Sequence, residues 1–294
     1  MASLGTMQTR LSLILASHMT TANITTLINR VHQEEVEAYD WYRLKVTTAL
    51  AVKAPKSAGT VAITQDTAVV TGTGTAFAAG DVGSFVRIGT EPTAIEILSF
   101  ASATSITLKS NWVGTTQTAA TYSLFPLYYS LPADAQEVMT IKRLRDVIEK
   151  TTYELDQIDP SRETTGAEAV YWAPFDHDTT ANAPRIELWP VASAAQLYTM
   201  QYKKGHTDLV ASTDRPLMQA AVVEAKSLYD AALTIYARSG DQRWFQLAKG
   251  FKEDYARELE EAKMQDVGKF GAIHQIHDSI GQVVPYDYYV SHDA

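Results

Sequence analysis

Cysteine is absent from this 294-residue sequence. The chain therefore has no disulfide framework, no thiolate ligand for zinc and no thiol nucleophile. Long apolar runs are missing as well. The N-terminal LSLILA stretch is shorter than the core of a secretory signal and far shorter than a transmembrane helix. We expect a protein without a cleaved leader and without a membrane partner.

Dense positive charge is also lacking. The sequence has 25 basic and 34 acidic residues, which gives a net charge of −9 with histidine neutral. Its densest basic segments are Lys203-Lys204 and the interrupted run Lys142-Arg143-Leu144-Arg145. Wrapping the phosphates of a DNA duplex requires a dense basic surface, so we exclude that class of function.

Apolar residues recur at helical spacing in three segments. Residues 21–52 have the i, i+3, i+4, i+7 pattern of one long helix, preceded by Thr20, whose side-chain oxygen can cap the helix start, and followed by Pro55. Residues 217–236 and 244–262 carry two further stripes, separated by Ser-Gly-Asp. The short break predicts an antiparallel helical pair near the C-terminus.

The segment between these helices has a different composition. Residues 57–126 contain short β-branched runs such as GTVAITQ, FVRIG, AIEILSFA, SITLKS and TYSLF, separated by Gly, Asp, Asn and Ser. These runs predict a small all-β domain of five or six strands, a barrel or a sandwich. The helical segments on either side must bury their stripes together, so we interpret this domain as an insertion.

The segment after the insertion mixes the two patterns. VMTIKRL is extended or mixed, residues 147–158 are predicted to be helical, and AVYWAPFD, RIELWP and AQLYTMQYKK are typical of three strands in a small antiparallel sheet. The predicted fold class is therefore α+β. It combines an antiparallel helical bundle body with a short accessory sheet (1–56 and 127–264), an inserted small all-β domain (57–126) and an extended C-terminal arm (265–294).

The C-terminal arm carries many large apolar groups among glycines, and exposing them all is costly at about 25 cal/mol per Å². We therefore predict that a partner or neighbouring subunit orders it. The candidate partner-binding residues are Phe270, Ile273, Ile276, Tyr286, Tyr288, Tyr289 and Val290.

Residues with catalytic or metal-binding chemistry are few and scattered. His274 and His277 lack a third ligand, the Asp176-His177-Asp178 run is expected in a loop, and Gly-x-Ser-x-Gly does not occur in the sequence. A pair of carboxylates for glycoside cleavage stays open, because sequence gives no distances. We expect a protein that is not an enzyme and that has no cofactor or metal.

The order of these parts resembles the head-to-tail adaptor (connector) proteins of tailed bacteriophages. The resemblance covers most of residues 20–265 and is carried by TVAITQDTAVVTGTGTAFAAGDVGSFVRIG, by TSITLKSNWVGTTQTAATYSLF and by the YSLPAD turn at residues 129–134. It implies a structural virion protein, made in the host cytoplasm, that sits at the capsid–tail junction. The implied partners are the portal protein, a tail tube or nozzle protein, further copies in a ring expected to be dodecameric, and the passing genomic DNA.

An acidic ring would line the DNA exit channel with carboxylates that repel phosphates. Glu34, Glu35 and Glu37 are the candidate channel-facing acids, although a simple solvated helix face explains them too. Two alternatives belong to other classes. A virion-associated cell-wall hydrolase needs a carboxylate pair with one raised pKa. A carbohydrate- or receptor-binding virion protein needs an exposed aromatic platform on the β domain, where Trp112 is the only tryptophan.

Overall fold

The computed structural model describes residues 2–178 and 182–268, which form two compact units. One unit is helical and joins residues 2–46 to residues 204–268. The other comprises residues 47–203 and is built mainly from strands. The chain thus leaves the helical unit once and returns to it.

The helical unit consists of α1 (Leu4–Leu15), α2 (Thr21–Ala38), the short 3-10 turn η1 (Tyr42–Leu44), α4 (Ala220–Ser239) and α5 (Gln242–Asp266). Side chains cap the starts of several helices: Ser3 Oγ accepts from Thr6 N, and Thr20 Oγ1 accepts from Asn23 N. Gly240 ends α4 in the left-handed region at φ 70°, which glycine adopts without strain.

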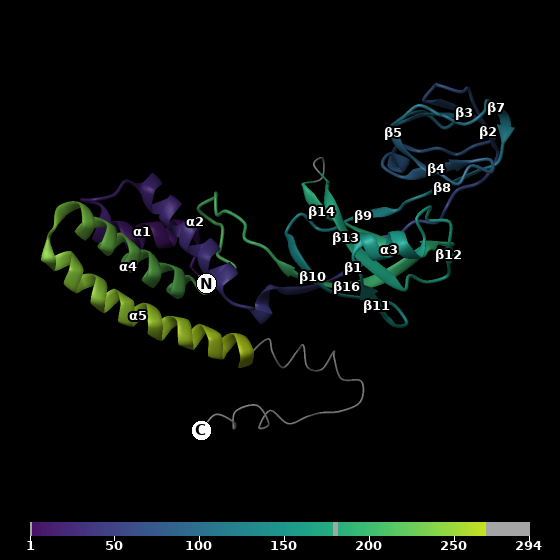
Figure 1. The fold of residues 1–294 in the computed structure, drawn as a ribbon. Coiled ribbons are helices and arrows are strands. Elements are labelled where there is room, and N and C mark those ends of the chain that lie inside the picture. Colours follow the sequence, from purple (N-terminus) through teal and green to yellow (C-terminus); the bar gives the residue numbers. More distant parts are fainter. Residues whose placement is uncertain (1, 179–181, 269–294) are drawn as a thin grey trace. The chain divides into compact units, whose positions relative to one another are not determined.

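The α4–α5 hairpin confirms the pair of helices predicted near the C-terminus, and the two lie side by side in Figure 1. One apolar core joins α1, α2, α4 and α5. Its most deeply buried members are Met7, Leu15, Ile28, Val31, Val36, Met218, Val222, Val223 and Ala262. This core consists of chain segments from both ends of the sequence, so neither end can fold the unit alone.

The long helix predicted over residues 21–52 is shorter in the structure. α2 ends at Ala38, and the chain is extended from Tyr39, turns at η1 and becomes strand β1 (Lys45–Val52). Leu50 and Val52 are buried at period two, and Val46, Thr47 and Thr48 are β-branched. Pairing with strand β16 (Gln196–Lys204) therefore overrides a spacing that also fits a helix.

The first large sheet has seven strands in the order β1, β16, β10, β11, β13, β14, β9. The bounds of the six further strands are β9 (Tyr128–Ser130), β10 (Ala135–Lys142), β11 (Asp146–Glu149), β13 (Tyr171–Asp178), β14 (Ala183–Trp189) and β16 (Gln196–Lys204). The β11–β13 pair is parallel, whereas β10–β11, β13–β14 and β14–β9 are antiparallel. The sheet is therefore mixed.

The second large sheet also has seven strands, in the order β7, β2, β3, β6, β5, β4, β8. They are β2 (Thr60–Ile63), β3 (Val69–Thr73), β4 (Phe85–Ile88), β5 (Ile95–Ser102), β6 (Ser105–Leu108), β7 (Gln117–Ala120) and β8 (Tyr122–Phe125). Its core includes Val61, Val70, Val86, Ile97 and Ile106. Smaller elements complete this unit: η2 (Ala79–Asp81), α3 (Thr152–Ile158), and the β12 (Thr165–Gly166) and β15 (Val191–Ala192) pair.

The predicted fold class is wrong. The described part of the chain is mostly β, with two large curled seven-stranded sheets and five α-helices, and it has no helical bundle body with a small inserted β domain. Six of the seven strands of the first sheet lie in the segment after residue 126, which was assigned to that body. The predicted helix over 147–158 is confined to α3, because Val147 already pairs with Ile141 in a strand.

Candidate functional site

The three candidate channel acids lie on α2, and the structure separates them. Glu34 and Glu37 are exposed, and Glu37 accepts a hydrogen bond from Gln33 (3.0 Å). Glu35 is only 1% exposed and points into the helical unit. Glu35 therefore leaves the set of candidate channel-facing acids, whereas Glu34 and Glu37 stay predictions.

Glu35 is the centre of a polar cluster that ties three helices together. Its Oε1 accepts from Lys226 Nζ of α4 and from Tyr255 OH of α5, both at 2.8 Å. Lys226 Nζ also lies 2.9 Å from Glu34 Oε2. Burial alone would lower the pKa of Lys226, but its hydrogen bonds to Glu35 and Glu34 raise it. The cluster thus places the Glu35–Lys226 pair within the otherwise apolar contact between α2, α4 and α5.

Asp230 of α4 lies beside this cluster. Its pKa is raised by burial, which outweighs the attraction of Arg30 and Lys226. A raised carboxyl pKa is what the hydrolase alternative requires. However, Arg30 Nη2 lies 3.1 Å from Asp230 Oδ2, so this carboxylate is held by a cation of the same helical contact. The arrangement fits helix docking better than acid catalysis.

Two side chains of α2 form hydrogen bonds with the segment between β16 and α4. Asn29 donates to Leu209 O (3.1 Å) and accepts from Leu209 N (3.0 Å). His32 Nε2 accepts from Leu217 N (2.9 Å), and its ring contacts the edge of the His206 ring at 4.7 Å. Burial, and then His206, lower the pKa of His32 to about 4. His32 is therefore neutral near pH 7.

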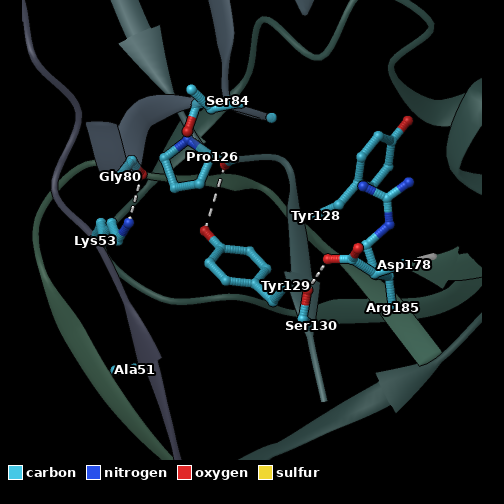
Figure 2. Close-up of a pocket in the computed structure, with 12 residues that line it drawn as sticks. Ala51, Lys53, Gly80, Ser84, Pro126, Tyr128, Tyr129, Ser130, Asp178 and Arg185 are labelled. Carbon is cyan, nitrogen blue, oxygen red and sulfur yellow. Dashed lines mark hydrogen bonds between the residues drawn. The ribbon is translucent and has the colours of Figure 1, made fainter. Parts of the chain in front are cut away.

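The β-rich unit contains a cavity of about 290 Å³ (Figure 2). Its polar lining groups are engaged within the protein: Lys53 Nζ donates to Gly80 O (2.7 Å), Tyr129 OH to Pro126 O (3.4 Å) and Ser130 Oγ to Asp178 Oδ2 (3.0 Å). A ligand entering here would have to exchange these hydrogen bonds for its own. The cavity therefore has space for a small molecule, but few of its polar groups could bind one without first breaking a hydrogen bond within the protein.

Aromatic side chains beside this cavity are also engaged. Tyr128 stacks on Phe175 at 3.7 Å between ring centroids, and burial raises the pKa of Tyr128 to about 12. The Arg185 guanidinium lies over the Tyr128 ring. It donates two hydrogen bonds to the Asp176 carboxylate, from Nε at 2.6 Å and from Nη2 at 2.5 Å. Trp112 is buried and donates from Nε1 to Thr115 O (2.9 Å). Trp112 therefore cannot form the exposed platform that the receptor-binding alternative needs.

The remaining candidate residues form no common centre. Asp176 pairs with Arg185, and Asp178 accepts from Ser130, so these carboxylates have protein partners. Across residues 2–178 and 182–268, no group of three or more His, Asp or Glu side chains could hold a metal ion. The seven predicted partner-binding residues of the C-terminal arm, together with His274 and His277, lie outside the described residues.

Sequence reasoning missed two features of this structure. Asp266, at the end of α5, accepts from Tyr42 N (2.6 Å), Arg43 N (3.2 Å) and Arg43 Nε (2.7 Å). The basic run 142–145 ends strand β10 at Lys142 and then forms the turn of a β10–β11 hairpin, so it is not a continuous extended segment. In the sequence, the signal for the first feature is an acidic residue at the end of the apolar stripe. The signal for the second is a basic run without a periodic pattern of apolar neighbours.

A search with protein-family models gave no match to the chain, and neither did a search of curated proteins. Among the residues that the structure describes, no helix is both long and apolar enough to span a membrane.

Proposed function

We propose that this protein is a structural subunit of a ring beneath the portal of a tailed bacteriophage, where it joins the capsid to the tail and extends the DNA exit channel. The proposal starts from the sequence resemblance over residues 20–265. Its expected location is the virion, at the capsid–tail junction. Its expected partners are the portal protein, a tail tube or nozzle protein and further copies of the chain.

The observation that supports it best is the distribution of exposed apolar side chains. Four lie at the ends of elements or in loops of both units, and each is between 82% and 85% exposed: Leu13, Val113, Leu144 and Val210. Single exposed apolar residues are common, but such extreme exposure in several separate places suits a chain that contacts several neighbours. An enzyme would instead be expected to gather its distinctive groups in one cleft.

Electrostatics is consistent with a channel subunit. The net charge of −9 and the exposed carboxylates of Glu34 and Glu37 would repel DNA phosphates and let the genome pass without adhering. Which acids face the lumen follows from how the copies are arranged, so the assignment of these two remains part of the proposal.

The segment after Gly268 is the proposed arm for the portal. A chain that ends at Gly268 keeps Asp266 and its bonds to Arg43, so we expect a folded helical unit. The same truncation should abolish co-purification with the portal, because it removes all seven predicted contact residues. A truncated chain that still forms complete portal complexes would contradict this role of the arm.

Copy number in the virion tests the function itself. Quantitative mass spectrometry of purified particles should give about one copy of this chain per portal subunit, as expected for matched rings on one axis. Absence from particles, or a copy number like that of the capsid shell, would reject the adaptor function. The hydrolase and receptor-binding alternatives would then come first.

A further inference from the structure

The turn of the β10–β11 hairpin is a basic projection on an acidic protein. Lys142 and Asp146 are paired across the hairpin, and Arg143 N donates to Arg145 O (3.1 Å) to close the turn. Leu144 is 85% exposed and Arg145 is exposed. We call Lys142, Leu144 and Arg145 the basic hairpin tip. A leucine this exposed between cations gains from burial only against another molecule.

Arg143 connects the turn to neighbouring residues of the same unit. Arg143 Nη1 lies 3.3 Å from Glu168 Oε1 and also donates to Ala167 O (3.5 Å). By contrast, Lys142 and Arg145 form no salt bridge with the part of the chain that the structure describes. One arginine thus fastens the turn while two cations and a leucine remain available. Such preorganisation lowers the entropy lost on docking.

The end of α5 offers the complementary pattern. Met264 is 69% exposed, and Glu260 and Glu261, four and three residues before it, are exposed on the same helix face. We call these three residues the acidic α5 patch. Within residues 2–178 and 182–268, the partner of Glu260 is Lys263 (3.0 Å), and Glu261 accepts from Gln265 Nε2 (2.9 Å). Exposed pairs of this kind contribute little to stability, so they exchange partners readily.

We propose that the basic hairpin tip of one copy docks on the acidic α5 patch of a second copy. Leu144 would cover Met264 while Arg145 and Lys142 pair with Glu260 and Glu261. The two surfaces are different and belong to different units, so the contact is head-to-tail and generates a ring when the rotation closes. The inference deepens the proposed function and rests on it for the closed ring. DNA is the less favoured occupant, because phosphates would use the cations but leave Leu144 exposed.

The absence of cysteine allows a direct test with the full-length chain. Leu144→Cys and Met264→Cys proteins are mixed, oxidised and analysed for disulfide-linked dimers by non-reducing gel and mass spectrometry. The control pair is Leu144→Cys with Leu13→Cys, because Leu13 is more exposed than Met264 (83% against 69%) but lies on α1. We expect about tenfold more product from the 144–264 pair than from the control, through the higher effective concentration in the docked state.

Charge reversal provides the second arm. Adding Lys142→Glu and Arg145→Glu to the Leu144→Cys chain should reduce the product to the control level. Placing Glu260→Lys and Glu261→Lys on the Met264→Cys partner should restore it. All four changed side chains lie on the surface, and unchanged circular dichroism and thermal melting verify that each variant is folded. Equal yields from the 144–264 and control pairs, or no response to charge reversal, would overturn the proposal.

Two outcomes separate this inference from the proposed function. Particles with the expected copy number, but without the 144–264 cross-link, would overturn only the docking contact. A cross-linking chain that is absent from particles would overturn only the adaptor function. If the charge reversals at Lys142 and Arg145 leave the cross-link unchanged but weaken binding to a short fluorescent DNA duplex, the tip contacts nucleic acid and the docking proposal is wrong.

Discussion

At the scale of single residues, the helical unit depends on buried polar side chains that have specific partners. Glu35 is surrounded by α2, α4 and α5, and its carboxylate receives hydrogen bonds from Lys226 and Tyr255. A buried charge is tolerated when such partners are present and is strongly destabilising when one is removed. The cluster therefore fixes which faces of the three helices meet.

Replacing Lys226 by Met should destabilise the protein by about 3 kcal/mol, because it leaves the Glu35 carboxylate buried without its cation. Adding Glu35→Gln to Lys226→Met should recover part of this loss. The control is Lys252→Met on the exposed side of α5, with an expected effect below about 0.5 kcal/mol. Urea unfolding measures the free energy of unfolding of the two Lys226→Met proteins and of the Lys252→Met control. Equal effects of the two single changes would show that the Glu35–Lys226 contact contributes nothing.

His32 gives the stability a defined pH dependence. Its pKa is about 4 in the folded protein against an ordinary value of 6.5, so the unfolded chain binds the proton more tightly. Stability from this group is therefore complete above about pH 6.5 and is lost as the pH falls towards 4, by at most about 3 kcal/mol. His32→Asn should flatten the unfolding free energy over this window relative to the parent. An unchanged slope in His32→Asn would assign the effect to other groups.

At the scale of elements, the last turn of α5 is fixed by one carboxylate. Asp266 binds the backbone of η1 and the side chain of Arg43, and both side chains are almost fully buried. A helix end fixed in this way cannot fray without also releasing the turn that leads into β1. The end of α5 and the turn that leads into β1 are therefore expected to open together.

Asp266→Asn should weaken this helix end, since it removes the negative charge that faces the buried Arg43 guanidinium, at a cost of about 3 kcal/mol. Amide hydrogen exchange should accelerate first in the last turn of α5 and around residues 42–44. Asp254→Asn, which removes only the exposed pair with Arg257 (2.9 Å), is the matched control and should change stability by under about 0.5 kcal/mol. Uniform acceleration over the whole helical unit would contradict a local anchor.

At the scale of the whole molecule, each unit has its own apolar core. The helical core consists of residues from both ends of the chain, whereas the cores of the β-rich unit lie within residues 47–203. The chain crosses between the units only through the adjacent strands β1 and β16. This division predicts that the helical unit does not need the β-rich unit to fold.

Replacing residues 47–203 by a short Gly/Ser linker between Val46 and Lys204 should therefore give a folded helical protein. Circular dichroism should show the helical spectrum without the β contribution, and melting should remain cooperative. The same protein with Lys226→Met serves as a control, because it should melt at a lower temperature if the native helix contacts have formed. A linked protein that shows no cooperative transition would mean that the helices depend on the β-rich unit.

Local patterns predicted a good part of these elements. The stripes at residues 217–236 and 244–262 became α4 and α5, and the turn residues and β-branched runs of residues 57–126 became strands. Periodicity failed at residues 45–52, where one spacing of apolar residues fits both a helix and a strand. Over residues 127–203 the three predicted strands became β13, β14 and β16, but the patterns did not show that they join β1, β9, β10 and β11 in one mixed seven-stranded sheet.

The sequence by itself determined composition, charge and the elements whose periodicity is strong, because these depend on residues close together in the chain. Only the tertiary structure decided that β1 pairs with β16, since strand partners about 150 residues apart leave no local signal. It also decided that Glu35 is buried while Glu34 and Glu37 are exposed. The three acids share one acidic stretch of α2, and their environments differ because Lys226 and Tyr255 approach Glu35 from other helices.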